Sequence, residues 1–179
     1  YGHSIFIVSD EPYKKIIYDG LTYPSPLNFH RHSIIATSHS KDLSVAGERI
    51  GYIALHPDAD DHDELITGFT FCTRTLGFIN APAFMQNVVR GLQNVSIDVT
   101  EYQRHRDFIY DNLVRMGYAV NKPQGAFYIF PRTPIPDDVA FVHELQNEHR
   151  VLTVPGVAFG TPGYFRLVYC VTTETLEAA

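Results

Sequence analysis

The residue best suited to covalent chemistry is Lys41, which follows the apolar run 33–37. Burial at the end of such a run favours the neutral amine over the ammonium, and a neutral amine is a nucleophile that forms Schiff bases with carbonyl compounds. Ser38 and Ser40 supply hydroxyl groups beside the lysine, and Arg49 follows eight positions later. Hydroxyls and a guanidinium hold anionic oxygens well, so the sequence predicts a phosphate site next to a reactive amine.

A carboxylate and a phenol precede this group in the chain. Asp10 closes an earlier apolar run, and Tyr13 comes three residues later. The carboxylate can pair with a protonated ring nitrogen, and the phenol can donate a hydrogen bond to a ring oxygen. Together with the amine of Lys41 and the phosphate site, these groups predict a binding site for pyridoxal 5′-phosphate.

Three apolar runs, 4–8, 33–37 and 49–55, have the length and continuity of strands that are buried on both faces, as in a parallel sheet. Each of them delivers polar residues at one end. Ligand sites in open α/β sheets lie outside the strand ends, so we expect these polar residues to meet at one edge of the sheet.

Helical patterns follow these strands. The charged stretch 58–64 is typical of a solvated loop that leads into a helix, and Pro82 suits the start of a helix whose apolar face runs through Phe84. The clearest helix is predicted at 98–116, where apolar residues recur at helical spacing and Gly117 follows as a C-terminal stop.

The remaining pattern is that of a small α+β unit. We therefore predict a domain boundary inside the long helix, with one domain at 1–100 and a second at 101–179. The predicted elements of the second domain after the long helix are strands at 126–130, 151–154 and 164–171 and a helix at 137–149.

Composition limits the classes of protein that fit. The 179 residues are 45% hydrophobic and 19% charged, a balance typical of a globular chain. A formal net charge of −6 argues against nucleic-acid binding, and no apolar run reaches the length of a membrane span, about 18 residues. Cys72 and Cys170 are too few for a disulfide framework, and their apolar flanks predict buried thiols in a reducing, cytoplasmic compartment. His30 and His32 lack a third ligand, so we expect no metal site.

Six short motifs follow one another along the chain. They are Ser9-Asp10-Glu11-Pro12-Tyr13, Ser38-His39-Ser40-Lys41, the segment 46–52, Asn80-Ala81-Pro82, Gly125-Ala126-Phe127-Tyr128 and Phe165-Arg166-Leu167. In order and spacing, this set resembles the C-terminal half of a class I and II pyridoxal-phosphate-dependent aminotransferase, of the aspartate aminotransferase fold type. The resemblance implies an α/β fold. It would comprise part of the mostly parallel sheet of the large cofactor-binding domain, followed by the small C-terminal α+β domain.

The resemblance also implies a role for each residue of the predicted cofactor site. Lys41 would form the Schiff base with pyridoxal 5′-phosphate and later move a proton between the substrate Cα and the cofactor. Asp10 would keep the pyridine nitrogen protonated, and Tyr13 would hydrogen-bond the ring oxygen. The phosphate would be bound by Ser38, Ser40 and Arg49.

Substrates and a partner are implied as well. Arg166 would clamp the α-carboxylate of the substrate, a two-bonded contact that lysine cannot reproduce. The reaction would move an amino group between an L-amino acid, aspartate-like by default, and a 2-oxo acid by a ping-pong route. The segment 77–82 resembles a loop that reaches the neighbouring subunit of a homodimer. The family's other cofactor contacts come from its N-terminal half, so we expect the chain to be a piece of a longer protein and to be inactive by itself.

Other interpretations stay open from the sequence. A lyase or decarboxylase of the same fold would share Lys41 and Asp10 and would differ in which bond of the substrate Cα breaks. A non-catalytic regulator that keeps the fold would need a DNA-binding segment, and a third interpretation is a purely structural or dimerisation unit. Arg49 could instead form a surface ion pair, and Arg166 an internal salt bridge.

Overall fold

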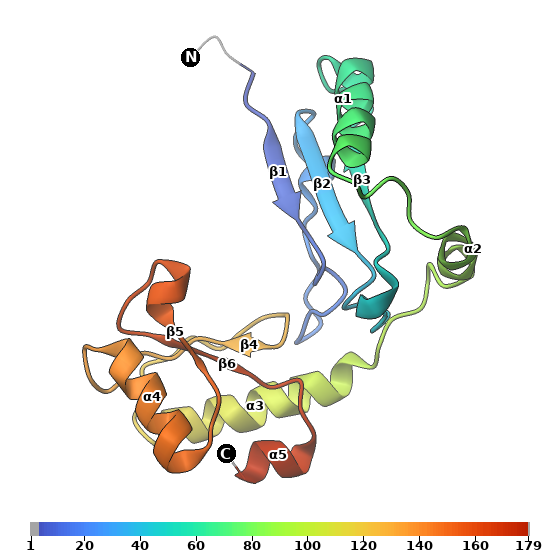
Figure 1. Cartoon of the computed structure of the whole chain (residues 1–179). Helices are drawn as coiled ribbons and strands as arrows, with labels where there is room; N and C mark the ends of the chain where they lie inside the picture. The colour runs from blue at the N-terminus through green and yellow to red at the C-terminus, as the bar shows by residue number, and fades with distance from the viewer. Residues whose placement is uncertain (1–3, 179) are drawn as a thin grey trace. The chain divides into compact units, whose positions relative to one another are not determined.

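The computed structural model of the chain describes residues 4–178, which form two compact units (Figure 1). The first unit comprises the residues up to Lys15 together with Thr22–Ile97. The second comprises Ile16–Leu21 together with the residues from Asp98 onwards. The sequence predicts a boundary close to this last point, but it does not predict that a six-residue segment near the start of the chain belongs to the second unit.

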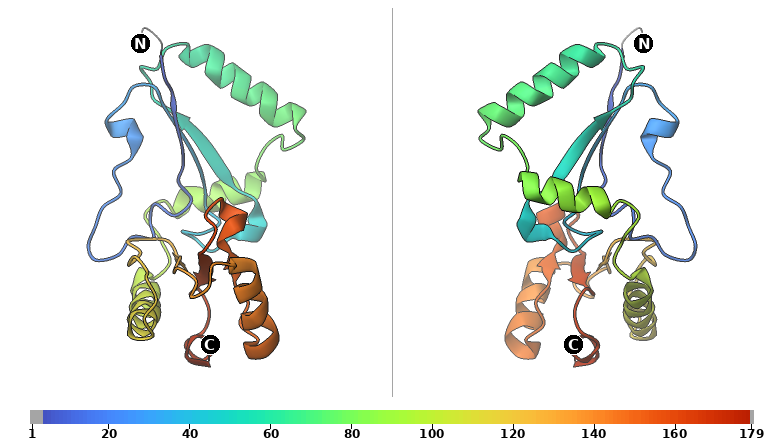
Figure 2. Two further views of the ribbon diagram at one scale, coloured as in Figure 1. Left: turned by 90° about the vertical axis from the view of Figure 1, so that its left-hand side faces the viewer. Right: turned by 90° about the vertical axis from the view of Figure 1, so that its right-hand side faces the viewer.

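The first unit is built on a sheet in the order β1 (Ile7–Asp10), β2 (Ser33–Ser38) and β3 (Gly51–Leu55), whose strands lie side by side (Figures 1 and 2). β1 and β2 are parallel, whereas β3 is antiparallel to β2. The predicted strands are present, but an apolar run carries no information on strand direction. The connection 39–50 is too short for a crossover with a helix of normal length, so the chain turns back into an antiparallel neighbour.

The expectation that each of these strands is buried on both faces is wrong for β1 and for β3, in which Tyr52 and Ile53 are 44% and 47% exposed. Ile34 and Ile35 of the central strand β2 are buried. In contrast, Ile5, just before β1, is 68% exposed, and Val8, within β1, is 69% exposed. β1 is an edge strand of the described sheet. No layer of described residues covers its faces in the way that a doubly buried strand requires.

Two α-helices complete the first unit. α1 (His62–Thr75) begins inside the charged stretch 58–64, whose last three residues are helical rather than loop, and it has no buried residue. α2 (Ala83–Gly91) packs Met85 against Ile50, and the face predicted through Phe84 is displaced by one position, since Phe84 is 76% exposed. The unit also contains two short 3₁₀ helices, η1 (Pro26–Asn28) and η2 (Ala46–Glu48).

The second unit combines an antiparallel sheet with helices. Phe141 and Val142 pack against Phe165 in its core. Its long helix begins where the Asp98 carboxylate accepts a hydrogen bond from the Thr100 N–H at 2.8 Å, a normal N-cap. The sheet order is β4-β6-β5. The elements are α3 (Val99–Arg115), β4 (Tyr128–Ile129), α4 (Asp138–His149), β5 (Val154–Pro155), η3 (Gly156–Phe159), β6 (Phe165–Val168) and α5 (Thr173–Ala178).

Two predictions made from composition can be compared with the structure. No helix among the described residues is long and apolar enough to cross a membrane. Cys72 and Cys170 are both exposed, so the prediction of buried thiols is wrong. Cys72 lies on α1, which has no buried face. Cys170 follows the buried Tyr169 in an extended segment, where alternate side chains face opposite sides.

Candidate active site

The ends of three strands come together at one edge of the first unit's sheet. Because β1 and β2 are parallel and Asp10 pairs with Ala36, the carboxyl ends of these strands adjoin. Because β3 is antiparallel to β2 and Gly51 pairs with Ser38, β3 starts at the same edge. This edge therefore carries the segments that hold the predicted cofactor residues Asp10, Tyr13, Ser38, Ser40, Lys41 and Arg49.

Lys41 lies next to the predicted phenol. Its Nζ is 5.9 Å from the centroid of the Tyr13 ring, near the outer limit of a cation–π contact. Both side chains are half-buried, so the amine is neither immersed in the core nor extended into bulk water. The amine and the phenol ring can therefore contact the same ligand.

The main chain around Lys41 is fixed on both sides. The His39 N–H donates to the Ile50 carbonyl at 3.1 Å and extends the pairing of β2 with β3 by one step. The side chains of His39 and Asp42 are buried and meet, with 3.2 Å between Nδ1 and Oδ2. The lysine thus projects from a short loop whose flanking residues are anchored.

The end of β1 is anchored as well. The Glu11 N–H donates to the Ala36 carbonyl at 2.8 Å, and the Thr37 hydroxyl donates to the Glu11 carbonyl at 2.9 Å. One oxygen of the buried Glu11 carboxylate accepts from the Tyr23 hydroxyl at 3.1 Å; the other has no hydrogen-bond partner among the described residues. These contacts fix the backbone beside Asp10, whose own side chain is exposed and can meet a ligand.

Arg49 sits on a strained turn at the start of β3. Its φ of 51° lies in the left-handed region, which is costly for residues other than glycine. Its Nη1 donates to the Ala46 carbonyl at 3.0 Å, and no carboxylate of residues 4–178 lies within ion-pair distance of it. A Cβ at Gly51 would lie 2.4 Å from the Thr37 carbonyl oxygen, so β3 approaches β2 this closely only with glycine there.

Arg166 is the one predicted site residue in the second unit. Its guanidinium carbon lies 4.6 Å from the Tyr128 ring centroid and 4.3 Å from that of Phe159, so the charged group is stacked between two aromatic rings. Its Nε is buried without a hydrogen-bond partner, and no described carboxylate pairs with it. The internal salt bridge considered from the sequence is therefore absent from the described part of the chain. A stacked guanidinium without an anion suits a ligand carboxylate.

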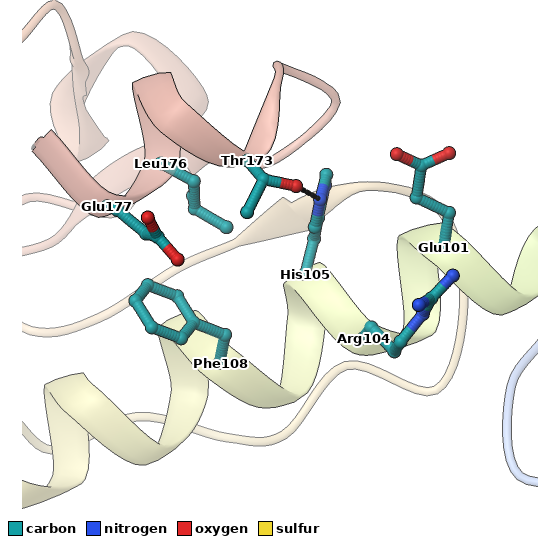
Figure 3. Close-up of a pocket in the computed structure, with 7 residues that line it drawn as sticks. All are labelled: Glu101, Arg104, His105, Phe108, Thr173, Leu176 and Glu177. Carbon is teal, nitrogen blue, oxygen red and sulfur yellow. Dashed lines mark hydrogen bonds between the residues drawn. The ribbon is translucent and has the colours of Figure 1, made fainter.

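A pocket in the second unit holds none of the predicted site residues (Figure 3). Its lining residues come from α3 and α5 and include Glu101, Arg104, Phe108 and Glu177. The buried His105 bonds the Tyr169 carbonyl through Nδ1 at 3.1 Å and the Thr173 hydroxyl through Nε2 at 3.2 Å. The carbonyl can only accept, so Nδ1 carries a proton. The Nε2 contact joins α3 to α5, and the Nδ1 contact joins α3 to the segment that follows β6.

The largest buried charge of the second unit is not among the residues predicted from the sequence. Arg106 is fully buried, donates to both oxygens of Asp19 at 2.7 and 2.8 Å and to the Pro123 carbonyl at 2.7 Å, and stacks on the Tyr18 ring. The hydrogen bond from the guanidinium lowers the pKa of Asp19. A charged residue on the apolar stripe of the helix predicted at 98–116 was the available signal. This pair ties Ile16–Leu21 to α3.

Comparisons with known proteins agree with this geometry. The family model described as "Aminotransferase class I and II" matches residues 1–179. A probable aspartate aminotransferase of Methanocaldococcus jannaschii is 38% identical over 99% of this chain and 48% of its own length. A probable N-acetyl-LL-diaminopimelate aminotransferase of Bacillus subtilis is 31% identical over 98% of this chain and 45% of its own length.

Among solved structures, an amino transferase from Eubacterium rectale superposes with a TM-score of 0.94 at 37% identity. The match covers 99% of this chain and 44% of the chain from Eubacterium rectale. The chain spans about half the length of the curated relatives it matches.

Proposed function

This chain belongs to the class I and II aminotransferase family, and we propose that the whole protein transfers an amino group between an L-amino acid and a 2-oxo acid. The observation that supports the proposal most directly is the gathering of Lys41, Tyr13, Asp10 and Arg49 at one edge of a sheet. The matched relatives carry aminotransferase names, which favours transfer over a lyase or decarboxylase reaction.

Members of this family depend on pyridoxal 5′-phosphate, and the residues at the sheet edge fit that group. They offer an amine beside a phenol, an exposed carboxylate at a neighbouring strand end and a guanidinium, whereas residues 4–178 contain no cluster of His, Cys, Asp or Glu that could hold a metal. When bound, the cofactor supplies an aldehyde and a ring that accepts electrons from the substrate Cα.

Each residue at this edge then has a distinct task in the proposal. Lys41 would hold the cofactor at its aldehyde carbon and would carry a proton to and from the substrate Cα. Asp10 holds a proton on the ring nitrogen, and Tyr13 donates to the ring oxygen. The phosphate is bound by Ser38, Ser40 and Arg49.

Arg166 binds the substrate α-carboxylate in the proposal. Its stacking between Tyr128 and Phe159 fixes the plane of the guanidinium, and its lack of a described carboxylate partner leaves it able to pair with a ligand. An aspartate-like amino acid is our default donor, because several matched relatives are named aspartate aminotransferases.

The test is a single-turnover reaction of the whole protein with aspartate in the absence of an acceptor. A transaminase leaves the amine form of the cofactor and releases one equivalent of 2-oxo acid, and a second 2-oxo acid then restores the starting absorbance. Release of product with the aldehyde form unchanged would identify a lyase instead. A Lys41→Ala variant should lose the reaction by at least about 10³-fold.

A homodimer and a cytoplasmic role in amino-acid biosynthesis complete the proposal. The segment 77–82 presents Phe78 and Ile79 to solvent at 75% and 59% exposure, which suits contact with a second subunit. Both cysteines are exposed and outside disulfides, as suits a reducing compartment.

A further inference from the structure

We propose that Asp42 is a positioning residue for Lys41 and that it acts together with Lys15 and His39. The inference rests on the proposed function, since it takes Lys41 as the reactive amine. None of the three residues belongs to the cofactor set described above. They form one polar cluster in which His39 and Asp42 are buried and Lys15 is partly exposed, and His39 and Asp42 flank Ser40 and Lys41 in the chain.

The loop is bridged across the reactive residue. His39 and Asp42 are 7% and 5% exposed, and their side chains meet at 3.2 Å, so the link spans Ser40 and Lys41. The backbone of the loop is tied at the same two positions. The His39 N–H donates to Ile50, and the Asp42 carbonyl accepts from the Ile97 N–H at 2.9 Å. A shift of Lys41 must therefore break or strain contacts on both sides of it.

Lys15 connects this cluster to segments next to the points where the chain leaves the first unit. Its Nζ lies 3.4 Å from Asp42 Oδ2 and donates to the Gln93 and Val95 carbonyls at 3.1 and 3.2 Å. Lys15 is the last residue of the first unit before Ile16, and Ile97 is the last before Asp98. Asp42 thus contacts Lys15 and Ile97, the two residues of the first unit after which the chain passes into the second unit.

Burying the Asp42 carboxylate costs free energy, so a contribution to stability alone does not explain this arrangement. Asp42 Oδ1 is buried and has no hydrogen-bond partner among residues 4–178. An apolar residue of similar volume avoids that penalty, whereas a carboxylate is needed to hold two donors at fixed angles. The groups that face the cluster are few: Lys15 and His39 face Asp42, and the His39 ring lies 6.0 Å from that of Tyr52, whose hydroxyl accepts from Lys14.

The test uses the whole protein loaded with pyridoxal 5′-phosphate and two substitutions, Asp42→Asn and Lys15→Met. Asparagine keeps the shape of the side chain and removes its charge, and Lys15 is partly exposed, so its replacement should be tolerated even if Asp42→Asn folds poorly. We expect the single-turnover rate constant to fall about 10- to 100-fold in each variant with KM within about twofold, because misplacement of a catalytic group slows chemistry without weakening binding.

A second readout separates positioning from a purely structural role. The cofactor's visible absorbance changes with pH as the nitrogen of Lys41 gains or loses a proton. Asp42→Asn leaves the Lys15 charge uncompensated and should lower the midpoint of that change, whereas Lys15→Met leaves the Asp42 charge and should raise it. The double variant should return close to the wild-type midpoint. If the substitutions only loosened the fold, the two midpoints would not shift in opposite directions.

The control is Asp63→Asn on α1, whose side chain is 98% exposed and which should change neither readout. Wild-type rate constants and unshifted midpoints in both variants, with or without a lower melting temperature, would overturn the inference and leave the proposed function intact. A wild-type protein that forms no bond between Lys41 and the cofactor would overturn both.

Discussion

At the scale of single residues, the groups proposed to act on cofactor and substrate have very different surroundings. Lys41 is half-buried beside an aromatic ring, Asp10 is exposed at a strand end, and Arg166 is stacked between two rings. The sequence could predict the grouping of Asp10 with Lys41, because each follows an apolar run and neighbouring parallel strands end together. It could not predict the burial of Asp42, because the contacts with Lys15 and Ile97 join segments far apart in the chain and a carboxylate after a lysine is typical of a solvated loop.

Arg166→Lys tests the proposed carboxylate clamp. Lysine keeps the charge but cannot stack as a plane between Tyr128 and Phe159 or donate two parallel hydrogen bonds. We expect KM for both the amino acid and the 2-oxo acid to rise about 10- to 100-fold, with a smaller change in kcat. The matched control is Arg132→Lys, since Arg132 is exposed in the same unit. Equal KM values in Arg166→Lys and wild type would remove Arg166 from the substrate site.

At the scale of elements, the sequence predicts which segments form strands and helices better than it predicts their surroundings. The run that becomes β3 is correctly placed, whereas the run 4–8 overlaps β1 only at Ile7 and Val8. The direction and exposure of both strands depend on neighbours that periodicity does not reveal. The buried face of α2 is displaced from the predicted one because Met85 fills the space beside Ile50. Contacts of this kind are fixed by packing between elements, which a single segment does not encode.

Gly51→Ala should damage the edge of the sheet on which the site depends. The new Cβ would lie 2.4 Å from the Thr37 carbonyl oxygen, which is main chain and cannot rotate away. We expect a loss of about 1–3 kcal/mol in the free energy of unfolding, with weaker cofactor binding. Gly68→Ala is the control: it lies inside α1 with nothing within 4 Å, and alanine there should raise stability by about 0.5–1 kcal/mol. Chemical denaturation of both variants decides the point, and a Gly51→Ala protein as stable as wild type would contradict the strand geometry.

Arg106→Met should destabilise the second unit by about 2 kcal/mol at neutral pH, because the Pro123 carbonyl loses its buried donor. The pair with Asp19 also makes stability depend on acid. The hydrogen bond from the Arg106 guanidinium holds the folded-state pKa of Asp19 below its usual value of 3.8, so this stabilising contribution is present above pH 3.8 and is lost as the pH falls further. Wild type should therefore lose more stability than Arg106→Met on acidification.

Urea denaturation at several pH values measures this difference. Arg104→Met, an exposed position on the same helix, is the control and should follow the wild-type curve. Parallel acid dependence in wild type and Arg106→Met would show that the pair does not link Ile16–Leu21 to α3 energetically.

At the scale of the whole molecule, the chain forms two units. The residues proposed to bind the cofactor belong to the first unit, and Arg166, proposed to bind the substrate, belongs to the second. The chain spans about half the length of the relatives it matches, and β1, α1 and the segment 77–82 all leave large apolar side chains exposed. Such surfaces are typical of regions that other chain segments or subunits cover.

Phe78→Asp tests the proposed contact between subunits. A charge at this exposed position would have to be desolvated in a dimer, so we expect the dimer dissociation constant to rise at least about tenfold. Sedimentation over a range of concentrations measures it. Phe29→Asp, at a position that is similarly exposed at 77%, should leave association unchanged. Equal dissociation constants for wild type and Phe78→Asp would exclude this segment from the interface.

The proposed function depends most on a covalent bond between Lys41 and pyridoxal 5′-phosphate. Borohydride reduction of the loaded whole protein fixes such a bond, and peptide mass spectrometry then locates it. We predict a phosphopyridoxyl group on the peptide that contains Lys41 and none after Lys41→Ala, with Lys14 and Lys15 unmodified in both. A label on another lysine of the wild-type protein, or no label at all, would contradict the central claim.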